Sequence, residues 1–188
     1  MKVENDKSPR KLKESEFLEP FMEYLEPACI NIKPGKDLVI YRTQDEIPVD
    51  EYGQMPRAKR NSLANSINRK LSKEEVEALS DKQREKFIGE WGLSCNISEE
   101  AARQSFLYTY KSKEERGASK EDLESYVHER GRYICRYIIT EETGLITPFD
   151  KKGHANLYLY EGVNLENYRD KVYNFKTIEY KSKDEDEQ

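Results

Sequence analysis

The sequence predicts an α+β protein with one folded domain, and three observations carry that prediction. The chain has 188 residues, which is enough for one domain with a substantial core and short for two. Helical patterns dominate its first two thirds, whereas strand patterns follow one another near its end, and this segregation favours a mainly antiparallel or mixed sheet with helices beside it. Aromatic residues make up 11% of the chain, so a core can form although 37% of the residues are charged.

The first half of the chain predicts a helix, a strand and further helices. Apolar residues at helical spacing indicate a helix from Glu16 that Pro27 ends. A Pro-Gly turn then precedes a short strand rich in β-branched residues. A capping box at Ser72 and Glu75 marks the start of another helix. The expected elements are a helix over 16–26, a strand over 38–41, a loop over 45–55, and helices over 61–70 and from 72 onward.

The second half alternates helices and strands and then ends in strands. Ser98 and Ser119 are each followed by acidic residues in the position of a first helical turn, so both predict helix starts, and Gly131 predicts a helix end. The expected elements are a strand over 91–97, helices from 98 and over 119–131, strands over 132–140 and 155–160, a short helix over 164–171 and a last strand over 172–180.

We expect the globular domain to span residues 15–181. Residues 1–14 mix both charge signs with little to bury, which is typical of a disordered arm, and residues 182–188 form an acidic tail. The chain lacks an apolar signal-peptide core and a membrane-length apolar run, so we expect a soluble, cytoplasmic protein. Its three cysteines form no C-x-x-C pair, and with two histidines they predict neither a disulfide framework nor a metal site.

The formal net charge of −5 argues against general affinity for nucleic acid. The stretch 57–73 is locally basic, because it contains six lysines and arginines and no acid. It is either a solvated helix face or a docking surface for a polyanion such as the pyrophosphate of NAD or RNA. No glycine-rich phosphate loop follows any predicted strand, which excludes two common kinds of nucleotide site.

Four polar residues lie at positions where a strand can present them to a ligand. Arg42 ends the first strand, and its planar guanidinium suits a phosphate or carboxylate. Ser94 lies in the second strand after Gly92, which permits close backbone approach. His154 opens the strand 155–160 and Glu161 closes it, so the first could move a proton and the second could stabilise positive charge on a sugar. Each of the four also has a purely structural alternative.

The order of these residues resembles the arginine–serine–glutamate order of ADP-ribosyltransferase-type and RES-type NAD-consuming toxin domains. The resemblance implies that Arg42, with Tyr41 beside it, and Ser94 bind NAD as the substrate. It implies that Glu161 stabilises the oxocarbenium ion as nicotinamide leaves, and we add His154 as a second candidate catalytic residue. The chain departs from the family in lacking an S-T-S triplet around Ser94 and in carrying Leu159 two residues before Glu161.

Two functions therefore stay open. The first is an NAD-consuming toxin or defence effector that acts as an ADP-ribosyltransferase or glycohydrolase without a metal. The second is a protein without enzymatic activity that binds a protein partner, as an immunity, inhibitor or anti-defence factor, because a tyrosine-rich surface and acidic tails suit an interface with a basic target.

Overall fold

A computed structural model describes residues 10–44, 47–51, 53–59 and 70–174. These residues form an α+β domain around a six-stranded sheet of order β4-β5-β2-β1-β3-β6, and every neighbouring pair is antiparallel. The predicted fold class is confirmed. The elements are α1 (Ser15–Leu18), η1 (Glu19–Phe21), α2 (Met22–Ala28), β1 (Leu38–Gln44), α4 (Lys73–Glu77), α5 (Asp81–Trp91), β2 (Leu93–Asn96), α6 (Glu99–Glu115), α7 (Lys120–Arg130), β3 (Tyr133–Ile139), β4 (Gly144–Ile146), β5 (His154–Leu159), η2 (Leu165–Tyr168) and β6 (Arg169–Asn174).

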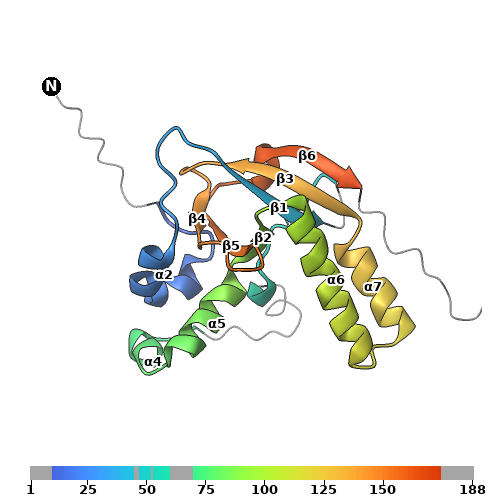
Figure 1. Cartoon of the computed structure of the whole chain (residues 1–188). Coiled ribbons are helices and arrows are strands. Elements are labelled where there is room, and N and C mark those ends of the chain that lie inside the picture. The colour runs from blue at the N-terminus through green and yellow to red at the C-terminus, as the bar shows by residue number, and fades with distance from the viewer. Residues whose placement is uncertain (1–9, 45–46, 52, 60–69, 175–188) are drawn as a thin grey trace, which may run out of the picture.

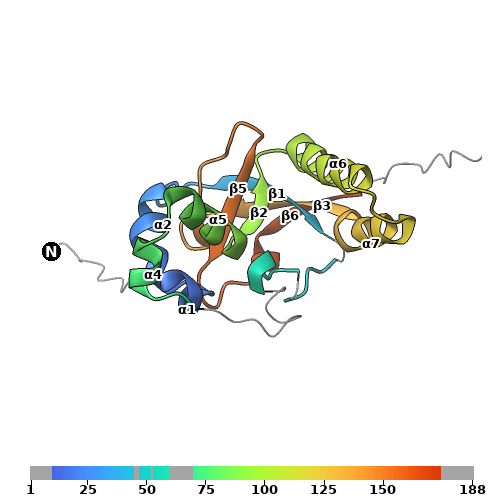
Figure 2. The same cartoon turned by 90° about the horizontal axis from the view of Figure 1, so that it is seen from below.

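The helices form two separate groups along the sheet. Figure 1 shows α2 and α5 on the side of β4 and β5, with α4 farther from the sheet, and α6 and α7 on the other side, near β1 and β3. Seen from below, β5 and β2 run between the two groups (Figure 2). The middle of the sheet is therefore flanked by a helical wall on either side.

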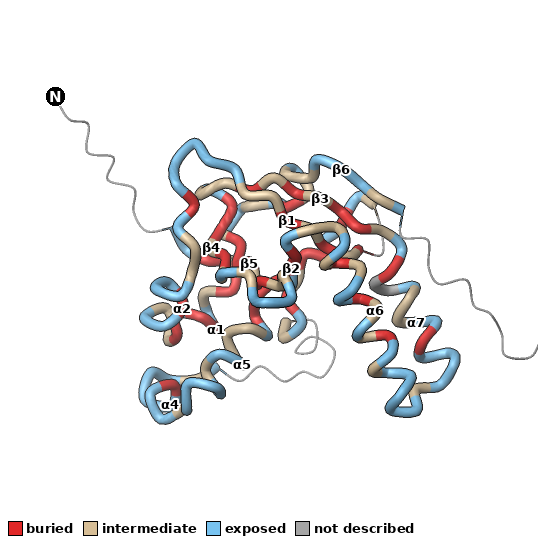
Figure 3. The backbone as a smooth tube through the Cα atoms, viewed as in Figure 1, coloured by how far each residue is buried: buried red, intermediate tan, exposed pale blue. Residues whose placement is uncertain are grey.

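The main core lies on the sheet face opposite the α6–α7 pair. It gathers alternate side chains of β1, β3, β2 and β5, as expected where one face of a strand is buried. Figure 3 shows that buried residues concentrate in the strands, whereas α4 and the turn between α6 and α7 are largely exposed. The fully buried members include Ile40, Tyr137, Ile139, Ile146 and Leu157.

Serine caps mark the starts of α4, α6 and α7, as the sequence predicts. The Ser98 side chain accepts a hydrogen bond from the Ala101 amide at the start of α6. Capping boxes open α4 at Ser72 and α7 at Ser119, and Gly131 ends α7. Within α6 the buried residues are Ala102, Phe106 and Tyr110, which share one face because they are four residues apart.

Several boundaries differ from the expected ones. Pro20 divides the first helix, which is α1, η1 and α2 in succession. Trp91 ends α5 and does not begin a strand, because its ring stacks on Phe17 with centroids 4.0 Å apart. Residues 144–146 form β4, a strand that the sequence did not predict, and β6 already begins at Arg169, inside the predicted helix over 164–171. Of the predicted helix over 61–70 only Lys70 is described, and of the predicted strand over 172–180 only residues 172–174 are described.

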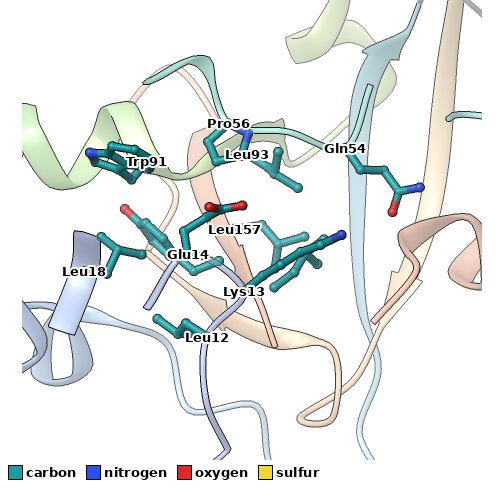
Figure 4. Close-up of a pocket in the computed structure, with 11 residues that line it drawn as sticks. Leu12, Lys13, Glu14, Leu18, Gln54, Pro56, Trp91, Leu93 and Leu157 are labelled. Atoms are coloured by element: carbon teal, nitrogen blue, oxygen red, sulfur yellow. The ribbon is translucent and has the colours of Figure 1, made fainter. Parts of the chain in front are cut away.

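The folded domain was expected to begin at residue 15, but the residues just before it are also part of the fold. Leu12 is only 2% exposed, and the Lys13 amide donates to the Leu159 carbonyl at 2.8 Å. Figure 4 shows Leu12, Lys13 and Glu14 around a small cavity that Leu157 and Trp91 also line. The Glu14 carboxylate is buried there and pairs with Lys59 at 2.9 Å. Sequence reasoning placed residues 10–14 in the disordered arm because one leucine among charges gives no periodic signal.

Candidate functional site

A cleft of about 750 Å³ lies between the two helical groups and over the middle of the sheet. This volume is within the usual range for a small-molecule site. Strands β1, β2 and β5 contribute its polar residues, α5 lines one side, and α6 and α7 line the other. Its polar lining includes Arg42, Arg57, Ser94, Asn96, His154 and Asn156.

Arg42 is 6% exposed and lies where two central strands diverge. Strands β1 and β2 are paired at Tyr41 and Asn96, and Arg42 is the next residue along β1. Its Nη2 donates to the Gly53 carbonyl over a long 3.4 Å. Its charge also opposes the rise that burial causes in the pKa of Cys95 and of Tyr137. Arg42 is also opposite Cys135 on β3, so its side chain lies on the core face of the sheet and borders the cleft where β1 and β2 part.

Ser94 and His154 form a hydrogen-bonded pair within the same cleft. The Ser94 Oγ lies 2.8 Å from the His154 Nε2. The two strands are in register with Asn96 opposite His154 and Asn156 opposite Ser94, so the serine and histidine are diagonal neighbours on one face. Burial lowers the pKa of His154 below its ordinary value, and the nearby Asp150 carboxylate partly opposes that change. A neutral imidazole next to a hydroxyl is suited to proton transfer.

A tight turn holds His154 at the start of β5. The Asp150 Oδ1 accepts hydrogen bonds from the amides of Lys152 and His154, at 2.8 and 2.9 Å. These bonds lower the pKa of the Asp150 carboxyl, with the His154 amide contributing most. Gly153 has a φ of 76°, a conformation that a residue with a side chain seldom adopts. The turn therefore fixes the direction in which the histidine enters the cleft.

Sequence reasoning missed two asparagines of the cleft. Asn96 is on β2, two residues after Ser94, and is only 5% exposed. Asn156 is on β5, and its Cβ would lie 2.6 Å from a Cβ added at Gly92, so that glycine permits the close approach expected of it. The sequence pattern that could have identified Asn96 is the alternation of Ser94 and Asn96 with the core residues Leu93 and Cys95, which places Ser94 and Asn96 on one face of β2.

Neither Glu161 nor Tyr41 lines the cleft, although the Tyr41 backbone pairs with Asn96 at its edge. Glu161 lies beyond the other end of β5, with its side chain 54% exposed and 3.2 Å from the Lys11 ammonium. The Tyr41 ring packs against the cluster of Ala102, Phe106 and Ile134 under α6. Of the five predicted site residues, Arg42, Ser94 and His154 share one cleft.

The described cations of the basic stretch 57–73 divide into two sets. Lys59, Lys70 and Lys73 pair with Glu14, Glu16 and Glu23 at 2.9, 2.7 and 2.8 Å. Arg57 lines the cleft. Arg60 and Arg69 lie outside the described residues. Much of the described stretch therefore balances the acids of the first helices.

Two features are absent from the described part of the chain. Among the described residues, no group of three or more histidine, cysteine, aspartate or glutamate side chains is placed to hold a metal ion. Within the same ranges, no helix has both the length and the apolar character that crossing a membrane requires.

The fold and the cleft define an α+β protein with a polar, arginine-containing cleft over the centre of its sheet. Compared with protein-family models, curated proteins and solved structures, the chain matches none of them.

Proposed function

We propose that the cleft binds NAD and that the protein cleaves the bond between nicotinamide and ribose, passing ADP-ribose to water or to another acceptor. The observation that carries this proposal is that a buried arginine and a serine–histidine pair line one cleft. The arginine supplies a site for phosphate, and the pair supplies a proton acceptor. The resemblance in the order of strand arginine and strand serine supports the same class of reaction.

The charges around the cleft support an anionic ligand. Arg42 and Arg57 line it together with Lys86 and Lys113, against two acids on α5, Glu85 and Glu90. A guanidinium can bind two phosphate oxygens at once, and a partly buried one is less screened by salt. Phe106 and Tyr126 also line the cleft and stack on each other with centroids 5.1 Å apart. Aromatic edges of this kind suit the bases of a dinucleotide.

In this reaction His154 acts as the general base. When the bond between ribose C1′ and nicotinamide breaks, its electron pair goes to the ring nitrogen and neutralises the pyridinium. The oxygen of water, or of an acceptor hydroxyl, then bonds to C1′ and passes its proton to the His154 Nε2. Because burial lowers the pKa of His154, the imidazole is neutral and able to accept that proton at neutral pH.

NAD binding and nicotinamide release test the proposal directly. Binding would be measured by calorimetry and release by chromatography, for the wild type, Arg42→Gln and the matched control Arg10→Gln. Arg10 pairs with Glu142 outside the cleft. We expect Arg42→Gln to weaken NAD binding at least about tenfold, since a charged hydrogen bond contributes about 1.5–3 kcal/mol, and Arg10→Gln to change it less than about twofold.

A wild type that neither binds NAD nor releases nicotinamide contradicts the proposal. Because Arg42 is buried, thermal melts of each variant must accompany the binding data. Arg42→Lys provides a second variant that keeps the charge and loses the planar fork.

A second candidate function is the binding of a protein partner, and one surface feature favours it. Tyr108 is 67% exposed and Ile97 is 53% exposed, and both adjoin the 150–154 turn. The Lys152 ammonium lies 4.7 Å from the Tyr108 ring centroid, and Ile97 would be 2.8 Å from a Cβ added at Gly153. Exposed aromatic and aliphatic side chains are typical of interfaces. A photo-crosslinker placed at position 108 in cells tests this function, with the exposed position Lys33 as the control. If position 108 yields no more protein adduct than position 33, the result counts against this function.

A further inference from the structure

The buried side chain of Asn96 carries an inference that rests on the proposed function and names a specificity residue within it. Asn96 lines the cleft and is nine-tenths or more buried, with 5% of its surface exposed. Its Oδ1 is buried and accepts no hydrogen bond from the described residues. A buried carbonyl oxygen without a donor is costly in a folded protein, so a site that keeps one calls for an explanation.

The position of Asn96 indicates which kind of group would satisfy this oxygen. Directly across from Asn96 on β5 is His154, the proposed base, and such cross-strand pairs have Cβ atoms about 4.5–5.5 Å apart. A base that receives the proton of the group attacking C1′ lies close to the nicotinamide end of NAD. The carboxamide of that ring presents two N–H donors, and a side-chain amide pairs well with another amide.

We propose that Asn96 recognises the carboxamide of the nicotinamide ring and so makes the cleft selective for NAD over the corresponding nicotinic acid dinucleotide. The carboxylate of nicotinic acid has no N–H to donate, so it leaves the Asn96 oxygen unsatisfied. A site built to receive a hydrogen bond discriminates strongly against a ligand that lacks the donor.

Three ligands distinguish recognition of the carboxamide from recognition of another part of the dinucleotide. They are NAD, nicotinic acid adenine dinucleotide, and nicotinamide hypoxanthine dinucleotide, in which the adenine amine is replaced. We expect the wild type to bind NAD at least about tenfold more tightly than the nicotinic acid analogue, the equivalent of one hydrogen bond. The hypoxanthine analogue should bind as NAD does, because its carboxamide is intact.

Asn96→Leu is the variant to compare, and Asn167→Leu, at an exposed position on η2, is its control. Asn96→Leu should lose the preference for NAD over the nicotinic acid analogue, while the control keeps it. Because leucine removes a buried oxygen without a donor, its melting midpoint should equal or exceed that of the wild type. This thermal result separates loss of recognition from loss of folding.

Each other outcome overturns the assignment in a distinguishable way. Equal wild-type affinity for NAD and the nicotinic acid analogue leaves NAD cleavage standing and removes the role of Asn96. A preference that persists in Asn96→Leu traces the selectivity to charge elsewhere in the cleft. If the wild type binds the hypoxanthine analogue more weakly than NAD and Asn96→Leu binds the two equally, Asn96 contacts the adenine amine and not the carboxamide. No binding of any of the three ligands removes the proposed function itself.

Discussion

The two ends of strand β5 carry His154 and Glu161, and their surroundings differ sharply. His154 is half-buried, bonded to Ser94 and part of the cleft. About 17 Å away along the strand, at the usual rise per residue, lies Leu159, and Glu161 follows beyond it. The Glu161 amide donates to the Lys11 carbonyl at 2.9 Å, and its carboxylate pairs with the Lys11 ammonium in solvent. One end of the strand is an open site, and the N-terminal segment covers the other.

The comparison shows what gives a strand-end residue a chemical role. Both residues are titratable and both flank the same alternating pattern, so the sequence presents them as equals. They are distinguished by what the neighbouring segments place beside each end: β2 brings a serine to His154, and residues 11–13 pair with the chain near Glu161. An exposed ion pair such as the one between Glu161 and Lys11 contributes little free energy.

The largest expected effect separates the two ends by activity. His154→Ala should lower nicotinamide release by about 10²–10⁴-fold, the usual contribution of a general base. Glu161→Gln should stay within about twofold of the wild type, because its carboxylate lies outside the cleft and pairs with Lys11. Single-turnover release of nicotinamide measures both variants.

The reverse ranking would overturn this view of β5. If Glu161→Gln loses activity and His154→Ala retains it, the catalytic carboxylate implied by the resemblance acts after all, through a conformation other than the described one. Calorimetric binding of NAD to each variant shows whether the change lies in binding or in turnover.

The next effect concerns the covered end. Leu12→Ala should reduce the free energy of unfolding by about 2–5 kcal/mol, because the buried leucine leaves a cavity. For a chain of this length that corresponds to a fall in melting midpoint of roughly 5–15 °C. Nicotinamide release below the new midpoint should be unchanged. Val3→Ala, in the segment that the sequence predicts to be disordered, is the control, and an equal loss there would show that the contribution is not specific to Leu12.

Local chemistry made most of the fold predictable. Serine caps at 72, 98 and 119 are confirmed because a side chain and a nearby amide are enough to define a helix start. The strand 132–140 is confirmed as β3 because six of its seven residues are apolar or aromatic. The buried segment 10–14 was missed, since its burial depends on pairing with residues 159–161, far along the chain.

The site was predictable in part, for a related reason. Arg42, Ser94 and His154 were identified because each ends, interrupts or opens a predicted apolar strand, although β1 continues past Arg42 to Gln44. Their convergence required the strand order β5-β2-β1 and the register that sets Ser94 diagonal to His154, which no local pattern encodes. Glu161 shares the same local signal, and its distance from the cleft followed only from the topology.

A smaller effect tests which face of β2 opens to the cleft. Ser94 is exposed, whereas the adjacent Cys95 is buried and its pKa is raised to about 12, mainly by burial. A thiol in Ser94→Cys should therefore react with a maleimide at least about tenfold faster than Cys95 in the folded protein, because the thiolate is the reactive form. Mass spectrometry of labelled peptides measures both rates. NAD should slow labelling at position 94, and rapid labelling of Cys95 would contradict the assigned face.

The smallest expected effect is a pH dependence at His154. Burial lowers its folded-state pKa below the ordinary 6.5, although Asp150 opposes part of that change. Well above pH 6.5 the residue is neutral in both the folded and the unfolded chain, so it adds no pH dependence to stability there. As the pH falls below that value the unfolded chain takes up the proton first, and stability declines until the pH has passed the lower folded-state pKa. His154→Gln should flatten this part of the stability curve, measured by urea melts between pH 7.5 and 4.5, whereas His128→Gln, at an exposed position, should leave it in place. Nicotinamide release should fall in the same direction, because the proton acceptor is lost as the imidazole is protonated. A wild-type activity that rises as the pH drops through this window would assign His154 the role of an acid and would end its role as the base.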